Sequence, residues 1–243
     1  MSRPAPRELT VLRKQRVTPN MVRVTLGGAG MAQFPAEQAS AYVKLMFPQP
    51  GQERPLLRTY TVRAQRPGEI DIDFVNHDNA GPASSWALSS QPGDSLMVGG
   101  PGPKRLIAPD GDWFLLAGDM TALPAISVNL EQLPAAACGH AVIEVISEAD
   151  IQPLAAPPGV QLHWLINPTP GQRDDLLLQA VEQLPWFEGS PSIWCACELN
   201  SMRRLRDHFR ARPEVDRKRL YISSYWKHGV REEEHKQLKQ QLG

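Results

Sequence analysis

Cysteine is scarce in this chain. Only three cysteines occur among 243 residues, an odd number that does not fit a disulfide framework. Cys195 and Cys197 lie two apart in the stretch CACE, but no further cysteine pair is near enough in the sequence to complete a zinc or iron–sulfur ligand set. We therefore expect these thiols to pack in a core, no protein-held metal, and a reducing compartment, the cytoplasm.

An excess of charge of either sign is also absent. Lys plus Arg number 26 and Asp plus Glu number 26, so the formal net charge is zero and no whole-molecule field attracts nucleic acid or a membrane. No apolar run reaches the roughly 18 residues of a spanning helix, and the opening MSRPAPREL lacks the apolar core of a signal peptide. We expect no nucleic-acid partner and no membrane span, and a charged ligand would have to meet a local patch.

The first half of the chain is rich in short alternating segments broken by Pro and Gly. Examples are MVRVTLGG, AYVKLMFP, LRTYTVRAQ and EIDIDFVNH, and strands of this length and spacing are typical of an antiparallel barrel or sandwich. A chain of this length accommodates two domains. We place the boundary near Ile107 to Gly111, giving domains 1–108 and 109–243.

The second half alternates buried strands with helices. WFLLAGD, HAVIEVIS, VQLHWLIN, SIWCACE and RLYISSYW have strand character, and the segments between them include the helical DDLLLQAVEQL and NSMRRLRDHFRAR. This alternation predicts a doubly wound parallel sheet. The charged stretch REEEHKQLKQQL predicts a C-terminal helix.

The stretch PLLRTYTVR places unusual side chains on one strand. Residues two apart share a face, so Arg58 and Tyr60 point one way while Thr59 and Thr61 point the other. A guanidinium grips phosphate, and a tyrosine ring can lie along a flat heteroaromatic system. The pattern suits a flavin nucleotide, although a solvated surface strand would give the same pattern.

A helix with a free N-terminus follows some fifteen residues later. FVNHDNAGPASSWAL predicts a strand, a turn and a short helix with Pro82 near its first position. The backbone N–H groups present between Gly81 and Ser84, of which Pro82 has none, would form a site for a pyrophosphate together with the hydroxyls of Ser84 and Ser85. An ordinary capped helix is the alternative.

Taken in order, RTYTVR, DFVNHDNAGPASSWA, QPGDSLMVGGPGP, LLAGDMTALPAI and YWKHGV resemble the siderophore-interacting proteins, which are flavin-dependent ferric-siderophore reductases of the ferredoxin-reductase-like superfamily. The resemblance covers about Val11 to Gly229. It implies an FAD-binding antiparallel barrel, 1–108, followed by a nicotinamide-binding α/β domain, 109–243, with a C-terminal helical extension. The FAD contacts that it implies are Arg58, Tyr60, Thr61, His77, Gly81, Pro82, Ala83 and Ser84.

The nicotinamide nucleotide is expected where LLAGDMTALPAI passes from a strand into a helix. The free N–H groups near Thr121 and Ala122 would face the crevice at the carboxyl edge of the sheet. The family usually has an acidic residue where this chain has Met120, which leaves Asp119 and Thr121 as the expected contacts. Glu198, at the end of another strand, and Tyr225 and Trp226, in the terminal YWKHGV, are further expected cofactor contacts.

The choice between NADH and NADPH depends on an acidic residue, Glu148, in the stretch SEAD. A carboxylate there can bond a ribose 2′-OH and would repel a 2′-phosphate, which favours NADH. An exposed acidic loop without this role is the alternative.

The substrate expected from the resemblance is a ferric siderophore. Ferric catecholates are anionic, so Lys44, Lys227, His228 and Arg231 are the expected cleft residues, each of which is otherwise an ordinary surface charge. Because flavin performs the redox chemistry, we expect no catalytic side chain, and we expect a monomer. A general NAD(P)H:flavin reductase and a non-catalytic siderophore- or nucleotide-binding module remain alternatives.

Overall fold

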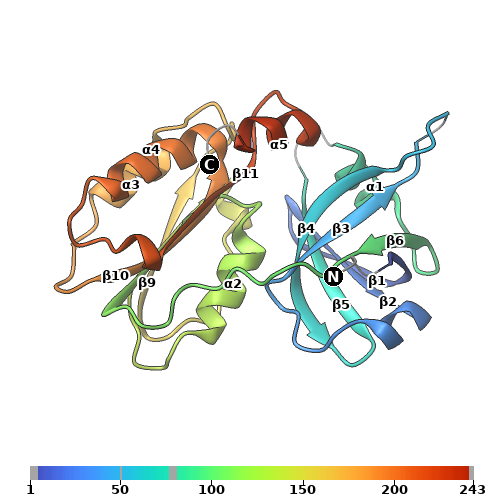
Figure 1. Cartoon of the computed structure of the whole chain (residues 1–243), viewed down its shortest axis with the longest axis horizontal. Helices are drawn as coiled ribbons and strands as arrows, with labels where there is room; N and C mark the ends of the chain where they lie inside the picture. Colours follow the sequence, from blue (N-terminus) through green and yellow to red (C-terminus); the bar gives the residue numbers. More distant parts are fainter. Residues whose placement is uncertain (1–4, 50, 77–80, 241–243) are drawn as a thin grey trace. The chain divides into compact units, whose positions relative to one another are not determined.

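The computed structural model describes residues 5–49, 51–76 and 81–240. The chain divides into two compact units, Met1–Arg105 and Leu106–Gly243. Figure 1 shows that the first is built mainly of strands and the second of strands and helices. The expected domain boundary between residues 108 and 109 lies close to this division and stays a prediction.

The first unit is a closed antiparallel barrel, which the resemblance implied and which is one of the two architectures that the alternating segments predict. Its strands follow the order β1-β2-β5-β4-β3-β6. A 3₁₀ helix, η1 (Ala29–Gln33), follows the second strand, and one α-helix, α1 (Pro82–Ser89), precedes the sixth. The strands are β1 (Arg7–Thr18), β2 (Met21–Gly27), β3 (Tyr42–Phe47), β4 (Leu56–Arg66), β5 (Glu69–Val75) and β6 (Ser95–Gly99).

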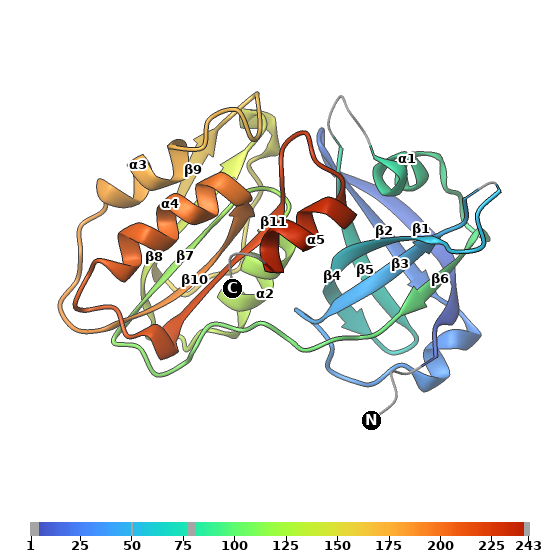
Figure 2. The same cartoon turned by 45° about the horizontal axis from the view of Figure 1, so that its top comes forward.

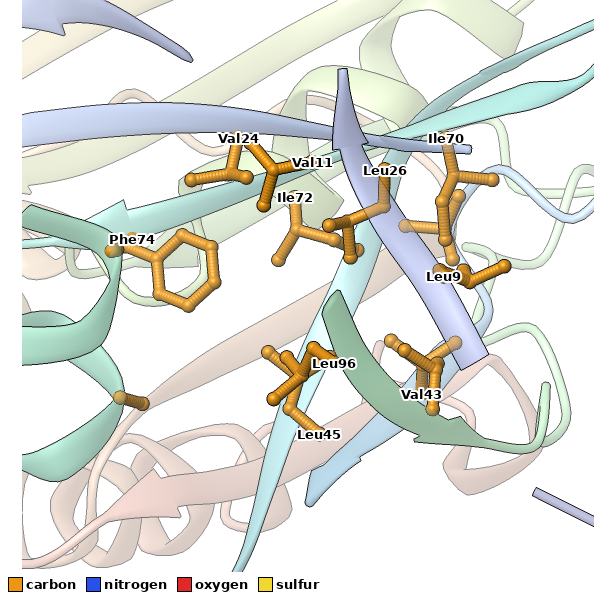
Figure 3. Packing of buried hydrophobic residues seen from close by; sticks show 14 of the residues in the cluster. Leu9, Val11, Val24, Leu26, Val43, Leu45, Ile70, Ile72, Phe74 and Leu96 are labelled. Atoms are coloured by element: carbon orange, nitrogen blue, oxygen red, sulfur yellow. The ribbon is translucent and has the colours of Figure 1, made fainter. Parts of the chain in front are cut away.

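Alternation of apolar and polar residues fixes which face of each strand enters the barrel. In β3, Val43, Leu45 and Phe47 are buried while the residues between them are half-buried. The same period places Ile70, Ile72 and Phe74 of β5 inside, and Figure 3 shows these side chains converging with those of the other strands. Burial of these side chains is the main stabilising term of the barrel.

The second unit is a five-stranded parallel sheet in the order β11-β10-β7-β8-β9. β7 is buried at every position, as expected for a central strand covered on both faces. The chain winds from β7 outward through β8 to β9, then returns to the other side of β7 for β10 and β11. The strands are β7 (Trp113–Gly118), β8 (Cys138–Val145), β9 (Gly159–Ile166), β10 (Pro191–Glu198) and β11 (Leu220–Trp226).

Helices cover both faces of this sheet, so the predicted doubly wound fold is confirmed. Figure 2 shows α3 and α4 together on one face, where they pack on Val142, Ile193 and Cys195, and α2 on the other face. The predicted C-terminal helix is α5, which packs against β11. The helical segments are α2 (Leu123–Gln132), η2 (Glu148–Asp150), α3 (Leu176–Glu182), α4 (Leu199–Arg210), η3 (Arg217–Arg219) and α5 (Glu232–Gln240).

Within the described ranges, no helix has both the length and the apolar character needed to cross a membrane.

Gly139 gives a direct test of the β7–β8 pairing. Its φ is 145°, and a Cβ at this position would collide with the carbonyl oxygen of Phe114 on the neighbouring strand. We expect Gly139→Ala to lower the free energy of unfolding by about 1–3 kcal/mol, because the strands must move apart. Urea denaturation measures the change.

Gly68 provides the control, because it also has a positive φ, 79°, but has open space where its Cβ would lie. Gly68→Ala should therefore cost only the backbone strain, about 1–2 kcal/mol or less. A Gly139→Ala variant no less stable than the Gly68→Ala variant would contradict the close strand contact.

Candidate functional site

Arg58 and Tyr60 lie on the same face of β4, as expected. In the continuous register between β3 and β4, Arg58 is opposite Leu45 and Tyr60 is opposite Val43. Since both partners belong to the barrel core, the face that Arg58 and Tyr60 share is the inner one. Thr61 lies on the other face, opposite Tyr42, so the structure does not bring its side chain together with theirs.

Tyr60 belongs to a group of four aromatic rings that sequence reasoning did not assemble. Its ring centroid lies 4.5 Å from that of Phe74, which in turn lies 5.9 Å from that of Trp86. Phe47 completes the group, 5.9 Å from Trp86. The rings come from β3, β4, β5 and α1, and Tyr60 and Trp86 are only partly buried. Parts of both side chains therefore remain accessible to a ligand.

The helix α1 begins at Pro82, as predicted, with Gly81 as its N-cap residue. Gly81 and Pro82 are exposed, whereas Ala83 and Ser84 are buried. The Ser84 hydroxyl donates to the carbonyl oxygen of Val75 at 2.9 Å and so fastens α1 to the end of β5. The first-turn N–H groups have no partner within an α-helix, so they stay the expected pyrophosphate donors. His77 lies outside the described residues.

Lys44 projects from β3 on the face opposite to the barrel core. It pairs with Thr59 in the register, donates a hydrogen bond to the Thr59 hydroxyl, and lies 5.6 Å from the centroid of the Tyr42 ring. Lys44 lies in the barrel unit, while Lys227, His228 and Arg231 lie in the α/β unit. Their expected convergence stays a prediction.

In the α/β unit, Asp119 occupies the end of β7 and is almost completely buried. One carboxylate oxygen accepts from both the N–H and the hydroxyl of Thr121, at 2.9 and 2.5 Å. The other accepts from the N–H of Glu198 at 2.9 Å and from the indole N–H of Trp226 at 2.7 Å. Burial raises the pKa of Asp119, and these donors act against that rise.

These bonds correct one expectation about the β7–α2 turn. The N–H of Thr121 bonds Asp119 Oδ1, and the N–H of Ala122 bonds the Asp119 carbonyl oxygen at 2.9 Å. Neither amide is therefore free to face a dinucleotide, because the turn folds back on Asp119. The proposed roles of Asp119, Thr121 and Ala122 in cofactor binding stay predictions, and Asp119 fits a positioning role better than direct contact.

Glu198 ends β10 and caps α4, where its side chain accepts from the N–H groups of Asn200 and Ser201. Its other oxygen lies 3.5 Å from Lys227 Nζ and accepts from the N–H of His228 at 3.2 Å. The structure thus brings Glu198, Lys227 and His228 together. Lys227 is only 21% exposed and is paired with a carboxylate, so its charge is partly neutralised.

Glu144, near the end of β8, is a site residue that sequence reasoning missed. It is 6% exposed and accepts from Asn167 Nδ2 at 2.8 Å. Burial, followed by the negative charge of Asp119, raises the pKa of Glu144 to about 7. An acidic residue inside an otherwise apolar strand, HAVIEVIS, was the available signal.

The remaining expected residues, Glu148, Tyr225 and Arg231, do not share in the contacts described for Asp119 and Glu198. Glu148 is exposed in η2, just after β8. Tyr225 is half-buried, with its ring edge-on to Trp194 at 6.3 Å, and Arg231 is exposed just before α5. Among the described parts of the chain, no three His, Cys, Asp or Glu residues gather as a metal site would require.

The pKa of Glu144 predicts a pH-dependent stability. A carboxyl whose pKa is raised from 4.5 to about 7 in the folded state stabilises the fold only while protonated, so this contribution is lost as pH rises through 7. Glu144→Gln keeps an acceptor for Asn167 but cannot ionise. Relative to this variant, the wild-type free energy of unfolding should fall by about 2 kcal/mol between about pH 5.5 and pH 8. Urea denaturation at both pH values measures this. A difference in the free energy of unfolding between the wild type and the variant that is the same at both pH values would contradict the prediction.

Comparison with known proteins identifies family models that match both units of the chain. The family model described as "Siderophore-interacting FAD-binding domain" matches residues 10–56 and 49–105, and the model described as "Siderophore-interacting protein" matches residues 111–229. Both halves of the chain are thus covered.

Individual relatives match over nearly the whole chain. The ferric vibriobactin reductase of Vibrio cholerae is 36% identical, over 94% of this chain and 92% of that protein. The NADPH-dependent ferric-chelate reductase of Escherichia coli is 30% identical, over 90% and 92%. The crystal structure of the siderophore-interacting protein SipS from Aeromonas hydrophila aligns with a TM-score of 0.87 and 38% identity, over 98% and 97%. The chain belongs to the siderophore-interacting protein family.

Proposed function

We propose that this protein reduces the iron of a ferric siderophore, with electrons that pass from a nicotinamide dinucleotide to FAD and then to the iron. The observation that carries the proposal is that one chain contains both halves of the family, the FAD-binding barrel and the α/β unit. The names of relatives as ferric vibriobactin reductase and NADPH-dependent ferric-chelate reductase support it.

The barrel carries a donor set that fits FAD. Arg58 supplies a guanidinium for phosphate, and the partly exposed rings of Tyr60 and Trp86 supply an apolar surface for the flavin ring. The first turn of α1 supplies N–H groups for the pyrophosphate. Arg58, Tyr60 and α1 would therefore hold the cofactor. Bound FAD accepts two electrons as hydride and releases them singly, which no amino-acid side chain can do.

The topology of the α/β unit supports a dinucleotide site at the carboxyl edge of its sheet. The strand order reverses between β7 and β10, and ligands of such sheets bind at the carboxyl ends of the strands on either side. Asp119 directly follows β7, and Glu198 is the last residue of β10. Asp119 accepts a hydrogen bond from the indole of Trp226, and Glu198 contacts Lys227 and the N–H of His228, so both carboxylates position the end of β11 beside the proposed dinucleotide site.

The substrate iron needs no protein ligand. A siderophore holds Fe(III) through hard oxygen donors, and reduction to Fe(II) weakens that binding, so a single electron releases the metal. We place the reaction in the cytoplasm because all three cysteines are free, and we expect the protein to act as a monomer.

Anaerobic reduction of the FAD-loaded protein by NADH or NADPH, followed by reoxidation with a panel of ferric chelates, tests the proposal. Reoxidation by ferric siderophores much faster than by free flavin is expected. Transfer mainly to free flavin would indicate a general flavin reductase. Failure to bind FAD would indicate a non-catalytic binding module.

Arg58→Ala should weaken retention of FAD. Loss of a charged hydrogen bond to phosphate costs about 1.5–3 kcal/mol, which corresponds to roughly a ten- to hundredfold weaker affinity. Equilibrium dialysis, with flavin absorbance as the readout, measures it. Arg16→Ala is the matched control, since Arg16 also lies on a barrel strand and donates to a nearby carbonyl oxygen, that of Pro19. Equal occupancy in the Arg58 and Arg16 variants would remove Arg58 from the site.

Lys44→Ala should raise the Michaelis constant for an anionic ferric catecholate and leave flavin reduction by the nicotinamide unchanged. The effect should shrink as salt rises, because exposed charges are screened over about 10 Å at 0.1 M. A neutral ferric hydroxamate should be affected less. Lys44 is tested separately from Lys227 because loss of Lys227 would also leave the buried Glu198 without its cation.

Lys218→Ala serves as the control for Lys44, since Lys218 is an exposed lysine in η3 of the other unit. If Lys44→Ala matches Lys218→Ala at low salt with ferric catecholate, Lys44 is a solvated surface charge.

A further inference from the structure

The connections at the carboxyl edge of the parallel sheet, where a dinucleotide's adenosine end would lie, carry one cation of their own. Three connections leave this edge after β7, β8 and β9, namely residues 119–122, 146–158 and 167–175, all described by the structure. They contain several carboxylates but a single Lys or Arg, which is Arg173. β10 runs directly into α4 and adds none.

The loop that carries Arg173 is tied to the end of β8. The N–H of Asn167 donates to the carbonyl oxygen of Val145 at 2.8 Å, and its side chain donates to Glu144. Asn167 also turns the loop back, because its side-chain oxygen accepts from the N–H of Thr169 at 3.1 Å. The beginning of the loop is thus held against the second strand of the sheet, where the ribose of a bound dinucleotide is recognised.

The middle of the loop reaches the carboxyl end of β11. Gly171 has a φ of 79°, and a Cβ there would lie 2.8 Å from Cβ of His228 and 2.9 Å from the ring of Trp226. Trp226 is the residue that Asp119 fixes at the end of β7. The loop therefore extends from β8 to the strand-order reversal, and Arg173 follows two residues after this contact.

The guanidinium of Arg173 is available to a ligand at little cost. It is 53% exposed, and it forms an ion pair with the neighbouring Asp175, itself 36% exposed, at 3.0 Å. Exposed ion pairs of this kind contribute little, whereas a phosphate dianion accepts two parallel hydrogen bonds from a guanidinium. A phosphate can therefore replace Asp175 as the partner.

The surrounding charges favour a cation at this place. Arg173 is close enough to Glu144 for its positive charge to act against the rise in the pKa of Glu144. The other charges facing Glu144 are the carboxylates of Asp119 and Glu198. The two other cations of this edge are already paired with carboxylates, Arg204 with Asp174 at 3.1 Å and Lys227 with Glu198 at 3.5 Å. Arg173 is therefore the cation of the loop that can offset the carboxylates of Asp119, Glu144 and Glu198 for a bound phosphate.

We infer that Arg173 binds the 2′-phosphate of NADPH and makes NADPH, rather than NADH, the preferred electron donor. The inference rests on the proposed function and deepens it, since it names the specificity-determining residue for the donor. It opposes the preference expected from Glu148, which acts through repulsion from an exposed loop. Two parallel charged hydrogen bonds outweigh one screened repulsion.

Binding of adenosine nucleotides tests the inference without reliance on flavin or iron. Isothermal titration calorimetry would compare adenosine 2′,5′-bisphosphate with adenosine 5′-monophosphate on the wild-type protein and on Arg173→Ala, Arg173→Lys and Arg204→Ala. Arg204 of α4 is the matched control because it is 49% exposed and pairs at 3.1 Å with Asp174, the residue next to Arg173. Stopped-flow reduction of bound flavin by NADPH and NADH would follow on the same variants.

The expected result is specific to the bisphosphate. Arg173→Ala should weaken its binding by about ten- to hundredfold and leave the monophosphate unchanged, while Arg173→Lys should retain part of the affinity as a point charge. Arg204→Ala should bind both ligands as the wild type does. The faster reduction by NADPH should disappear in Arg173→Ala.

Two outcomes would overturn the inference. One is a wild type that binds the two nucleotides equally or is reduced faster by NADH. The other is an Arg173→Ala variant that keeps its affinity for the bisphosphate or weakens both ligands alike. Failure of the proposed function looks different, because Arg173-dependent binding would persist while reduced protein fails to transfer electrons to any ferric siderophore.

Discussion

The buried carboxylate of Asp119 is the constraint on which the candidate crevice depends. Its two oxygens accept four hydrogen bonds from donors that belong to the β7–α2 turn, to the end of β10 and to the end of β11. A carboxylate removed from water is costly unless its lone pairs are satisfied, so the three segments are held in one arrangement. The position of Trp226, 107 residues away in the sequence, follows from this single side chain.

Acidic side chains gather at the carboxyl edge of the parallel sheet. Asp119, Glu144 and Glu198 bring three acidic groups close together, and the edge remains stable because each is compensated differently. Asp119 is satisfied by neutral donors, Glu198 by Lys227 and the amides of α4, and Glu144 by a pKa raised to about 7. An anionic cofactor at this edge thus depends on the few cations that remain.

The architecture followed from the sequence because it depends on local patterns. Alternation in AYVKLMF predicts the inward Val43 and Leu45, and the same period correctly places Arg58 with Tyr60 on one face of β4. The crevice contacts did not follow, because the pairs Asp119–Trp226 and Glu144–Asn167 arise from parallel strand register between distant segments. From the sequence alone, Glu144 is expected to be a surface residue, because the burial of β8 on both faces is not evident before the sheet is known.

The chain's own side chains leave the redox step to a bound cofactor. Cys195 and Cys197, the pair with thiol chemistry to offer, are fully buried among the residues under α3 and α4, and burial raises the pKa of both thiols. A thiol of this kind is neither accessible nor nucleophilic. The contribution of the protein's own side chains is therefore to bind and orient the cofactor and the substrate. If Arg58, Tyr60 and α1 hold the flavin and Asp119 and Arg173 shape the dinucleotide site, as we propose, substitutions at these residues should alter affinity before they alter chemistry.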